Sequence, residues 1–152
     1  MKIILADDLS EVRSGLRILL EHEITIDKVD EAADLESLIA KVKEGGHDLI
    51  LLDWELDKEN VPGIIPVIKM LSPNTGIIAL SSHPEALKSA MKAGVDAFVS
   101  KGEHPEKLLK AINNMFKTTD EIATAVNRSL STTCITLSLN PFVDFFFVAM
   151  ES

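Results

Sequence analysis

Two adjacent aspartates, Asp7 and Asp8, stand directly after the apolar run at residues 3–6. A third, Asp53, ends another apolar run, HDLILLD at residues 47–53. Three carboxylates at one site repel one another unless a cation joins them, and oxygen ligands without a neighbouring histidine or cysteine favour Mg²⁺ over zinc or copper. These aspartates are therefore candidate magnesium ligands. The alternative interpretation of Asp7 and Asp8 is a helix N-cap beside the positive end of a helix dipole.

Two further polar side chains follow apolar runs of the same kind. Ser81 comes after residues 76–80, and Lys101 comes after residues 97–100. A metal ion and a lysine on either side of one carboxylate form a site for a phosphoryl group, whose negative oxygens need neutralising. Asp53 is the candidate for that carboxylate, which can act as a nucleophile and form an acyl phosphate. Ser81 adds a hydroxyl donor; a turn serine and a solvated surface lysine are the alternatives.

The elements that position these residues are predicted from apolar patterning. Five runs are too short or too continuous for amphipathic helices and indicate buried parallel strands, at residues 2–6, 24–32, 48–52, 76–80 and 97–100. Apolar stripes with helical spacing lie between or after them, at residues 12–20, 35–42 and 108–116. This alternation predicts an α/β fold, a doubly wound parallel five-stranded sheet with helices on both faces. Ligands of such sheets bind at the carboxyl ends of the strands, where the candidate residues stand.

Four segments in this order, ILADD, LILLDWEL, IIALSSH and DAFVSK, resemble the receiver domain of bacterial two-component response regulators. The resemblance covers about residues 1–118, and the N-terminal segment is most similar to receivers that carry a LuxR-type helix-turn-helix. It implies a CheY-like, flavodoxin-like (βα)5 fold and a switch operated by phosphorylation. The implied partner is a sensor histidine kinase or a phosphotransfer protein. Receivers of this family commonly dimerise, so a homodimer is a further expectation.

The same resemblance implies a role for each residue of the acid cluster. Asp53 would be the phosphoacceptor and Asp8 a direct Mg²⁺ ligand, while Asp7 would position the metal through water. Glu55, two residues after the acceptor, would offer its backbone carbonyl to the metal. Lys101 would contact the phosphoryl oxygens.

Four residues match switch or tuning positions of the family. Ser81 would contact the phosphoryl group, and Phe98 matches the aromatic residue whose rotamer follows that hydroxyl; simple core packing is the alternative for Phe98. Glu55 and His83 stand where the family tunes the lifetime of the phosphate. The loop after the third strand departs from the family pattern, because DKEN at residues 57–60 is inserted there.

The last part of the chain, residues 119–152, is predicted to be a C-terminal tail. Arg128 is its one basic residue, and the segment is too short and too weakly charged for a DNA-binding domain. It is expected to fold against the receiver domain or to be disordered. The alternative is a docking segment, since an exposed FVDFFFVAM at residues 142–150 would form an apolar patch.

Composition restricts the partners and the compartment. The chain has 152 residues, and 24 acidic against 15 basic residues give a formal charge of −9, which disfavours direct contact with nucleic acid or an anionic membrane. The single cysteine, Cys134, cannot form an internal disulfide, and the N-terminus lacks the pattern of a signal peptide. No apolar run approaches the roughly 18 residues of a membrane span. A cytoplasmic protein is expected.

Three other functions remain open at this point. A haloacid dehalogenase-type phosphatase also uses an aspartate nucleophile with Mg²⁺, but it requires Asp-x-Asp, and Glu55 stands at the second position. A flavodoxin requires a Ser/Thr-rich phosphate loop, where this chain has Asp7 and Asp8. The third is a receiver-like scaffold that is never phosphorylated. A receiver turns over no small-molecule substrate, so the chain is not expected to be an enzyme.

Overall fold

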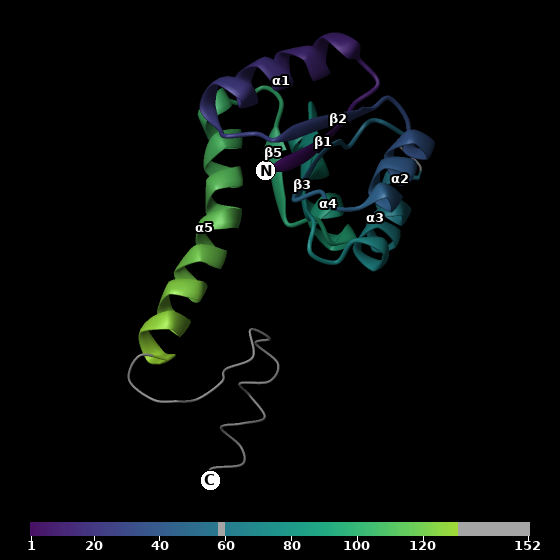
Figure 1. Cartoon of the computed structure of the whole chain (residues 1–152). Coiled ribbons are helices and arrows are strands. Elements are labelled where there is room, and N and C mark those ends of the chain that lie inside the picture. Colours follow the sequence, from purple (N-terminus) through teal and green to yellow (C-terminus); the bar gives the residue numbers. More distant parts are fainter. Residues whose placement is uncertain (58–59, 131–152) are drawn as a thin grey trace. The chain divides into compact units, whose positions relative to one another are not determined.

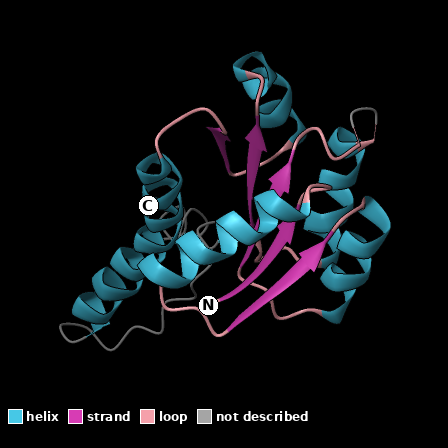
Figure 2. Cartoon of the chain, turned by 90° about the horizontal axis from the view of Figure 1, so that it is seen from above, coloured by secondary structure: helices cyan, strands magenta, loops and turns pink. Residues whose placement is uncertain are grey.

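The computed structural model describes residues 1–57 and 60–130. Five parallel strands form one sheet in the order β2-β1-β3-β4-β5 (Figure 1), with strands pointing the same way in Figure 2. The strands are β1 (Lys2–Ala6), β2 (Lys28–Ala32), β3 (Leu49–Asp53), β4 (Gly76–Ser81) and β5 (Ala97–Ser100). This arrangement confirms the predicted flavodoxin-like α/β fold.

Helices cover both faces of the sheet. They are α1 (Ser10–Glu23), α2 (Leu35–Glu44), α3 (Val61–Leu71), the 3₁₀ turn η1 (Pro84–Ala86), α4 (Leu87–Ala93) and α5 (Pro105–Leu130). α1 and the first turns of α5 lie on one face, whereas α2, α3 and α4 lie on the other. The chain order reverses between β1 and β3, and the crevice at the carboxyl ends of these two strands is where such folds bind ligands.

Both faces of the central strands are buried, which explains their continuous apolar sequence. Ile4 and Ile50 belong to a core cluster that includes Leu38 of α2 and Ile65 of α3. Side chains alternate across a strand, so the residues next to Ile4 and Ile50 face the layer of α1 and α5. They are Ile3, Leu5, Leu49 and Leu51, and each is at most 1% exposed.

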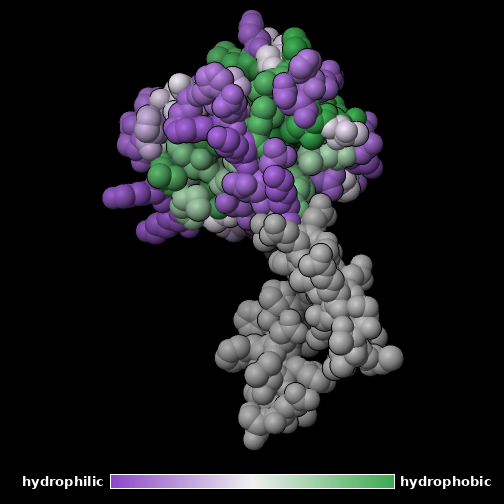
Figure 3. Space-filling model, turned by 90° about the vertical axis from the view of Figure 1, so that its left-hand side faces the viewer, coloured by the Kyte–Doolittle hydropathy of each residue, from purple (hydrophilic) through white to green (hydrophobic). Residues whose placement is uncertain are grey.

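The layer of α1 and α5 leaves an apolar cavity of about 310 Å³. Val12 and Leu16 of α1 line it together with Val99 of β5 and Leu108 of α5. Figure 3 views the side on which α1 and α5 lie in Figure 1, and hydrophobic groups are exposed there among hydrophilic ones.

The predicted second strand, residues 24–32, is wrong at its beginning, because β2 starts at Lys28. Ile24 instead caps the end of α1, and its N–H donates to the carbonyl oxygen of Leu20 at 2.8 Å. The N–H of Asp27 donates to the carbonyl oxygen of Met1, also at 2.8 Å. Capping of α1 and pairing with the N-terminus therefore use backbone groups that a longer strand would need.

α5 continues to Leu130, so the first part of the predicted tail, residues 119–130, is helical. Residues 1–112 form one compact unit, and the domain boundary near residue 118 stays a prediction. The aromatic segment at residues 142–150 lies outside the described residues. None of the helices in the described part of the chain combines the length and the apolar character of a membrane span.

Candidate functional site

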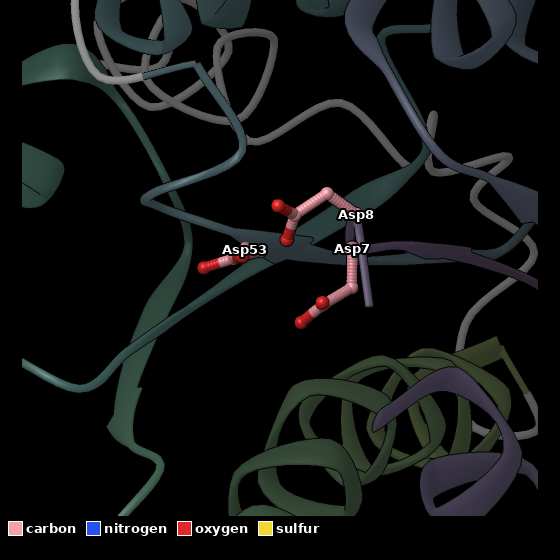
Figure 4. A group of neighbouring side chains, drawn as sticks. All are labelled: Asp7, Asp8 and Asp53. Atoms are coloured by element: carbon pink, nitrogen blue, oxygen red, sulfur yellow. The ribbon is translucent and has the colours of Figure 1, made fainter. Parts of the chain in front are cut away.

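The structure brings the three predicted aspartates together at the carboxyl end of the sheet. Asp7 and Asp8 follow β1, and Asp53 ends β3, the strand that pairs with β1. One carboxylate oxygen from each lies within 4.8 Å of the others (Figure 4). Asp7 and Asp53 are only 1% and 3% exposed, whereas Asp8 is open to solvent. The cluster is therefore a group of oxygen donors that could hold a metal ion. Solvent reaches it at Asp8.

Lys101 lies beside this cluster, as predicted from its place after β5. Its Nζ is 2.8 Å from Oδ2 of Asp7 and 3.0 Å from Oδ1 of Asp53. The backbone N–H of Lys101 donates to the carbonyl oxygen of Ser81 at 2.8 Å, which extends the pairing of β4 with β5. Burial opposes the charge on this lysine, but hydrogen bonds to the Asp7 and Asp53 carboxylates outweigh it and raise the pKa of Lys101. The ammonium is therefore a fixed positive charge.

Burial of Asp53 disfavours the ionised form of its carboxylate. Burial raises the pKa of Asp53 to about 6, against hydrogen bonds from the backbone N–H of Glu55 and from Lys101 that favour ionisation. The N–H of Glu55 is 3.0 Å from Oδ1 of Asp53. Desolvation of this kind means that an added cation is bound more favourably than it would be in water. Asp53 is thus a buried carboxylate whose ionised form gains from a cation.

The loop that carries Asp7 and Asp8 is held by an arginine that sequence reasoning missed. Arg13 in α1 donates from Nη1 to the backbone carbonyl oxygen of Asp7 at 2.6 Å and from Nε to Glu31 of β2 at 2.8 Å. The N–H of Leu9 donates to Oδ1 of Asp7 at 2.9 Å. The sequence signal that could have found it is a basic residue at the end of the first turn of the helix that follows the acidic pair.

On the other side of Asp53, the side chain of Glu55 contacts Ser81. The Ser81 hydroxyl, which is completely buried, donates to Oε1 of Glu55. Glu55 also accepts from the N–H of Ser82 at 3.3 Å and lies 3.1 Å from Nδ1 of His83. Burial disfavours the charge of Glu55, but hydrogen bonds from Ser81 and His83 outweigh it and lower its pKa. The resemblance gave Glu55 a metal-binding carbonyl and a place among the residues that tune the phosphate lifetime, but it did not predict that the Glu55 carboxylate accepts from Ser81.

Two sequence predictions concern the surroundings of the site. Phe98 of β5 is partly buried and packs against the core cluster, which agrees with the core-packing alternative and leaves its switching role a prediction. In the inserted loop at residues 57–60, the Asn60 amide donates to the Asp57 carboxylate at 3.0 Å. Residues 58 and 59 lie outside the described part of the chain.

Comparison with known proteins indicates the family. Residues 3–113 match the family model of the response regulator receiver domain. An uncharacterized transcriptional regulatory protein of Bacillus subtilis (strain 168), YhcZ, is 36% identical over 114 residues, 72% of this chain and 52% of that protein. The nitrate/nitrite response regulator protein NarL of Escherichia coli (strain K12) is 33% identical over 113 residues, 73% of this chain and 52% of that protein. The chain thus spans about half the length of these relatives.

Solved structures give the same result. RcsB from Salmonella enterica serovar Typhimurium, bound to promoter rprA in the presence of the phosphomimetic BeF₃⁻, is 28% identical with a TM-score of 0.66. The match covers 75% of this chain and 67% of that one. A CheY-like receiver domain protein from Methanospirillum hungatei JF-1 is 24% identical with a TM-score of 0.68, covering 79% and 97% of the two chains, and shows the shared fold.

Proposed function

Because this chain belongs to the response regulator receiver domain family, we propose that it accepts a phosphoryl group on Asp53 from a partner histidine kinase or phosphotransfer protein. A carboxylate oxygen of Asp53 attacks the phosphorus atom of a phosphohistidine, the phosphorus–nitrogen bond breaks, and an acyl phosphate forms. The donor imidazole leaves with the electron pair of that bond and takes up a proton from water.

The observation that carries this proposal is the position of Asp53 between a lysine and an acid pair that come from two other strands. Lys101 is 3.0 Å from Oδ1 of Asp53 and would neutralise an oxygen of the incoming phosphoryl group. Ser81, completely buried at the end of the neighbouring strand β4, would donate its hydroxyl to another. We further propose that Phe98 follows this hydroxyl when the surface switches between two conformations.

The donor set fits Mg²⁺. Three carboxylates supply oxygen ligands within 4.8 Å of one another, and in the described residues a single lysine offsets their charge at close range. Asp7, Asp8 and Asp53 would hold the ion, together with the backbone carbonyl of Glu55. A bound Mg²⁺ supplies positive charge to the phosphoryl oxygens and removes the repulsion among the carboxylates.

The proposed output is a changed protein surface and not a product, so the chain is proposed to turn over no small-molecule substrate. A second copy of the chain is the candidate reader of that surface. Sustained release of phosphate from small phosphate esters would contradict this and favour an aspartate-nucleophile phosphatase.

Intact-mass spectrometry after incubation with acetyl phosphate tests the proposal. Wild type is expected to gain the mass of one phosphoryl group when Mg²⁺ is present and to gain none in EDTA. Asp53→Asn should gain none under either condition, whereas Asp30→Asn, which alters a buried aspartate of β2 away from the site, should behave as wild type. An unmodified wild type in Mg²⁺ would contradict phosphorylation and leave the receiver-like scaffold.

A further inference from the structure

We propose that in the unphosphorylated state the Glu55 carboxylate accepts the hydrogen bond of the Ser81 hydroxyl, the same hydroxyl that a phosphoryl group on Asp53 would use. Phosphorylation therefore has to displace the Glu55 carboxylate. Glu55 would then be an internal competitor that sets how readily the receiver switches on. This inference rests on the proposed function of Asp53, and it concerns the regulation of the same site.

The contacts of Ser81 carry the first step. Its hydroxyl has one proton to donate, and Oε1 of Glu55 is the nearer of two acceptors, because the carbonyl oxygen of His83 lies at 3.2 Å. The backbone N–H of His83 donates to the same Oγ at 2.9 Å and so takes up one of its lone pairs. Because Ser81 is completely buried, no water replaces Glu55 without a rearrangement. The hydroxyl cannot serve Glu55 and a phosphoryl oxygen at the same time.

Charge makes the two acceptors exclusive. Both carboxylate oxygens of Glu55 accept hydrogen bonds, one from the Ser81 hydroxyl and the other from the N–H of Ser82, as in a carboxylate anion. A phosphoryl group on Asp53 would bring further negative charge beside Glu55, whose backbone N–H already donates to Oδ1 of Asp53 at 3.0 Å. Anions on neighbouring side chains of a partly buried site repel each other. Phosphorylation and departure of the Glu55 carboxylate are therefore linked events.

The structure has room for the displaced carboxylate. A cavity of about 290 Å³ is lined by Trp54, Glu55, His83 and Ala86. Glu55 can turn into this cavity and remain beside His83, whose Nδ1 is 3.1 Å from Oε1. A ligand shifts an equilibrium only by binding one state better, and here the phosphoryl group favours the state in which Ser81 is released.

The test measures binding of the phosphomimetic BeF₃⁻ in Mg²⁺, which involves no hydrolysis and so separates switching from phosphate lifetime. Trp54 is the one tryptophan of the chain and lines the cavity, so its fluorescence is the readout, with fluorine NMR of the bound fluoride as a second measurement. Glu55→Ala is expected to bind BeF₃⁻ on the order of tenfold more tightly than wild type, because a hydrogen bond to a charged group no longer competes.

Two variants show whether the gain acts through Ser81. Glu85→Ala removes an exposed negative charge from η1 and should change the affinity by less than about twofold. In a Ser81→Ala background, Glu55→Ala should give a clearly smaller gain than it does with Ser81 present, because the contested hydroxyl is gone and only charge repulsion is relieved. An equal gain with and without Ser81, or none in Glu55→Ala, would overturn the inference. If wild type itself does not bind BeF₃⁻ in a manner that depends on Asp53, the proposed function fails first.

Discussion

Two groups of charged residues on the same sheet contain buried aspartates and differ in how the negative charge is balanced. At the carboxyl ends of β1 and β3, Asp7 and Asp53 share Lys101. Closer to the amino ends, Asp30 of β2 meets Lys28 and His47, each at 2.8 Å. We refer to the first group, with Asp8, as the acid cluster and to the second group as the Asp30 cluster.

Because their charge is balanced differently, the pKa values of Asp53 and Asp30 are shifted in opposite directions. Burial raises the pKa of Asp53 to about 6. Burial also disfavours the charge of Asp30, but the hydrogen bonds from His47 and Lys28 outweigh it, so its pKa is lowered. The charge of the Asp53 carboxylate is therefore incompletely neutralised by the protein, whereas that of the Asp30 carboxylate is neutralised by Lys28 and His47. A buried acid indicates a binding site when its own fold does not neutralise it.

The largest expected difference between the clusters is in phosphorylation. Lys101→Ala should slow the gain of a phosphoryl group from acetyl phosphate by about 100-fold, because it removes a preorganised positive charge from the reacting oxygens. Lys28→Ala removes the matching lysine of the Asp30 cluster and should leave the rate within about twofold of wild type. Intact-mass time courses in Mg²⁺ measure both rates. Equal rates in the two variants would mean that Lys101 serves only to hold Asp7 and Asp53.

For the free energy of unfolding, we expect the larger loss from a substitution in the Asp30 cluster. Asp30→Asn is expected to lower the free energy of unfolding by about 2 kcal/mol, because it leaves Lys28 and a buried His47 without their anion. In EDTA at pH 7, Asp53→Asn is expected to raise it by about 1 kcal/mol, since it removes a poorly neutralised buried charge. Urea unfolding followed by circular dichroism measures both. Destabilisation by both substitutions to the same extent would remove the distinction between the clusters.

The acid cluster was predictable from sequence and the Asp30 cluster was not. Asp7, Asp8 and Asp53 each end an apolar run, and parallel strands bring such ends to one edge. Asp30 lies inside a strand, and His47 precedes another strand that is not its neighbour in the sheet. Nothing in their spacing shows that they meet.

The contact between Glu55 and Ser81 marks another limit. The strand pattern placed both residues at the carboxyl edge of the sheet. The acceptor to which the Ser81 hydroxyl donates depends on side-chain rotamers, which no local sequence pattern specifies. The beginning of β2 was missed for a related reason. Residues 24–27 are apolar enough for a strand, yet capping of α1 and pairing with Met1 use their backbone groups.

A smaller effect is expected in the pH dependence of stability without metal. Asp53 has a raised pKa, so the stability it contributes is present below about pH 4 and is lost as the pH rises through about 6. Asp30 has a lowered pKa, so its contribution is present above its ordinary pKa and is lost as the pH falls below it. Between pH 5 and pH 7 in EDTA, wild type should therefore lose about 1 kcal/mol relative to Asp53→Asn.

Urea unfolding at the two pH values measures this difference. Asp34→Asn serves as the control, because Asp34 is an exposed N-cap of α2 that accepts a hydrogen bond from the N–H of Ser37, contacts no histidine in the described part of the chain and has a lowered pKa; it should keep the wild-type slope. A slope in Asp53→Asn as steep as in wild type would assign the titration to another group and would leave Asp53 no different from Asp30.

The smallest expected effect is stabilisation by Mg²⁺. At an ion concentration near its Kd, binding to the folded state raises the free energy of unfolding by about 0.4 kcal/mol. Asp53→Asn should lose this gain and Asp30→Asn should keep it, with NaCl of equal ionic strength as the control for screening. The gain should also be smaller at pH 5 than at pH 7, because a proton on Asp53 competes with the ion. An equal gain in both variants would place the ion outside the acid cluster.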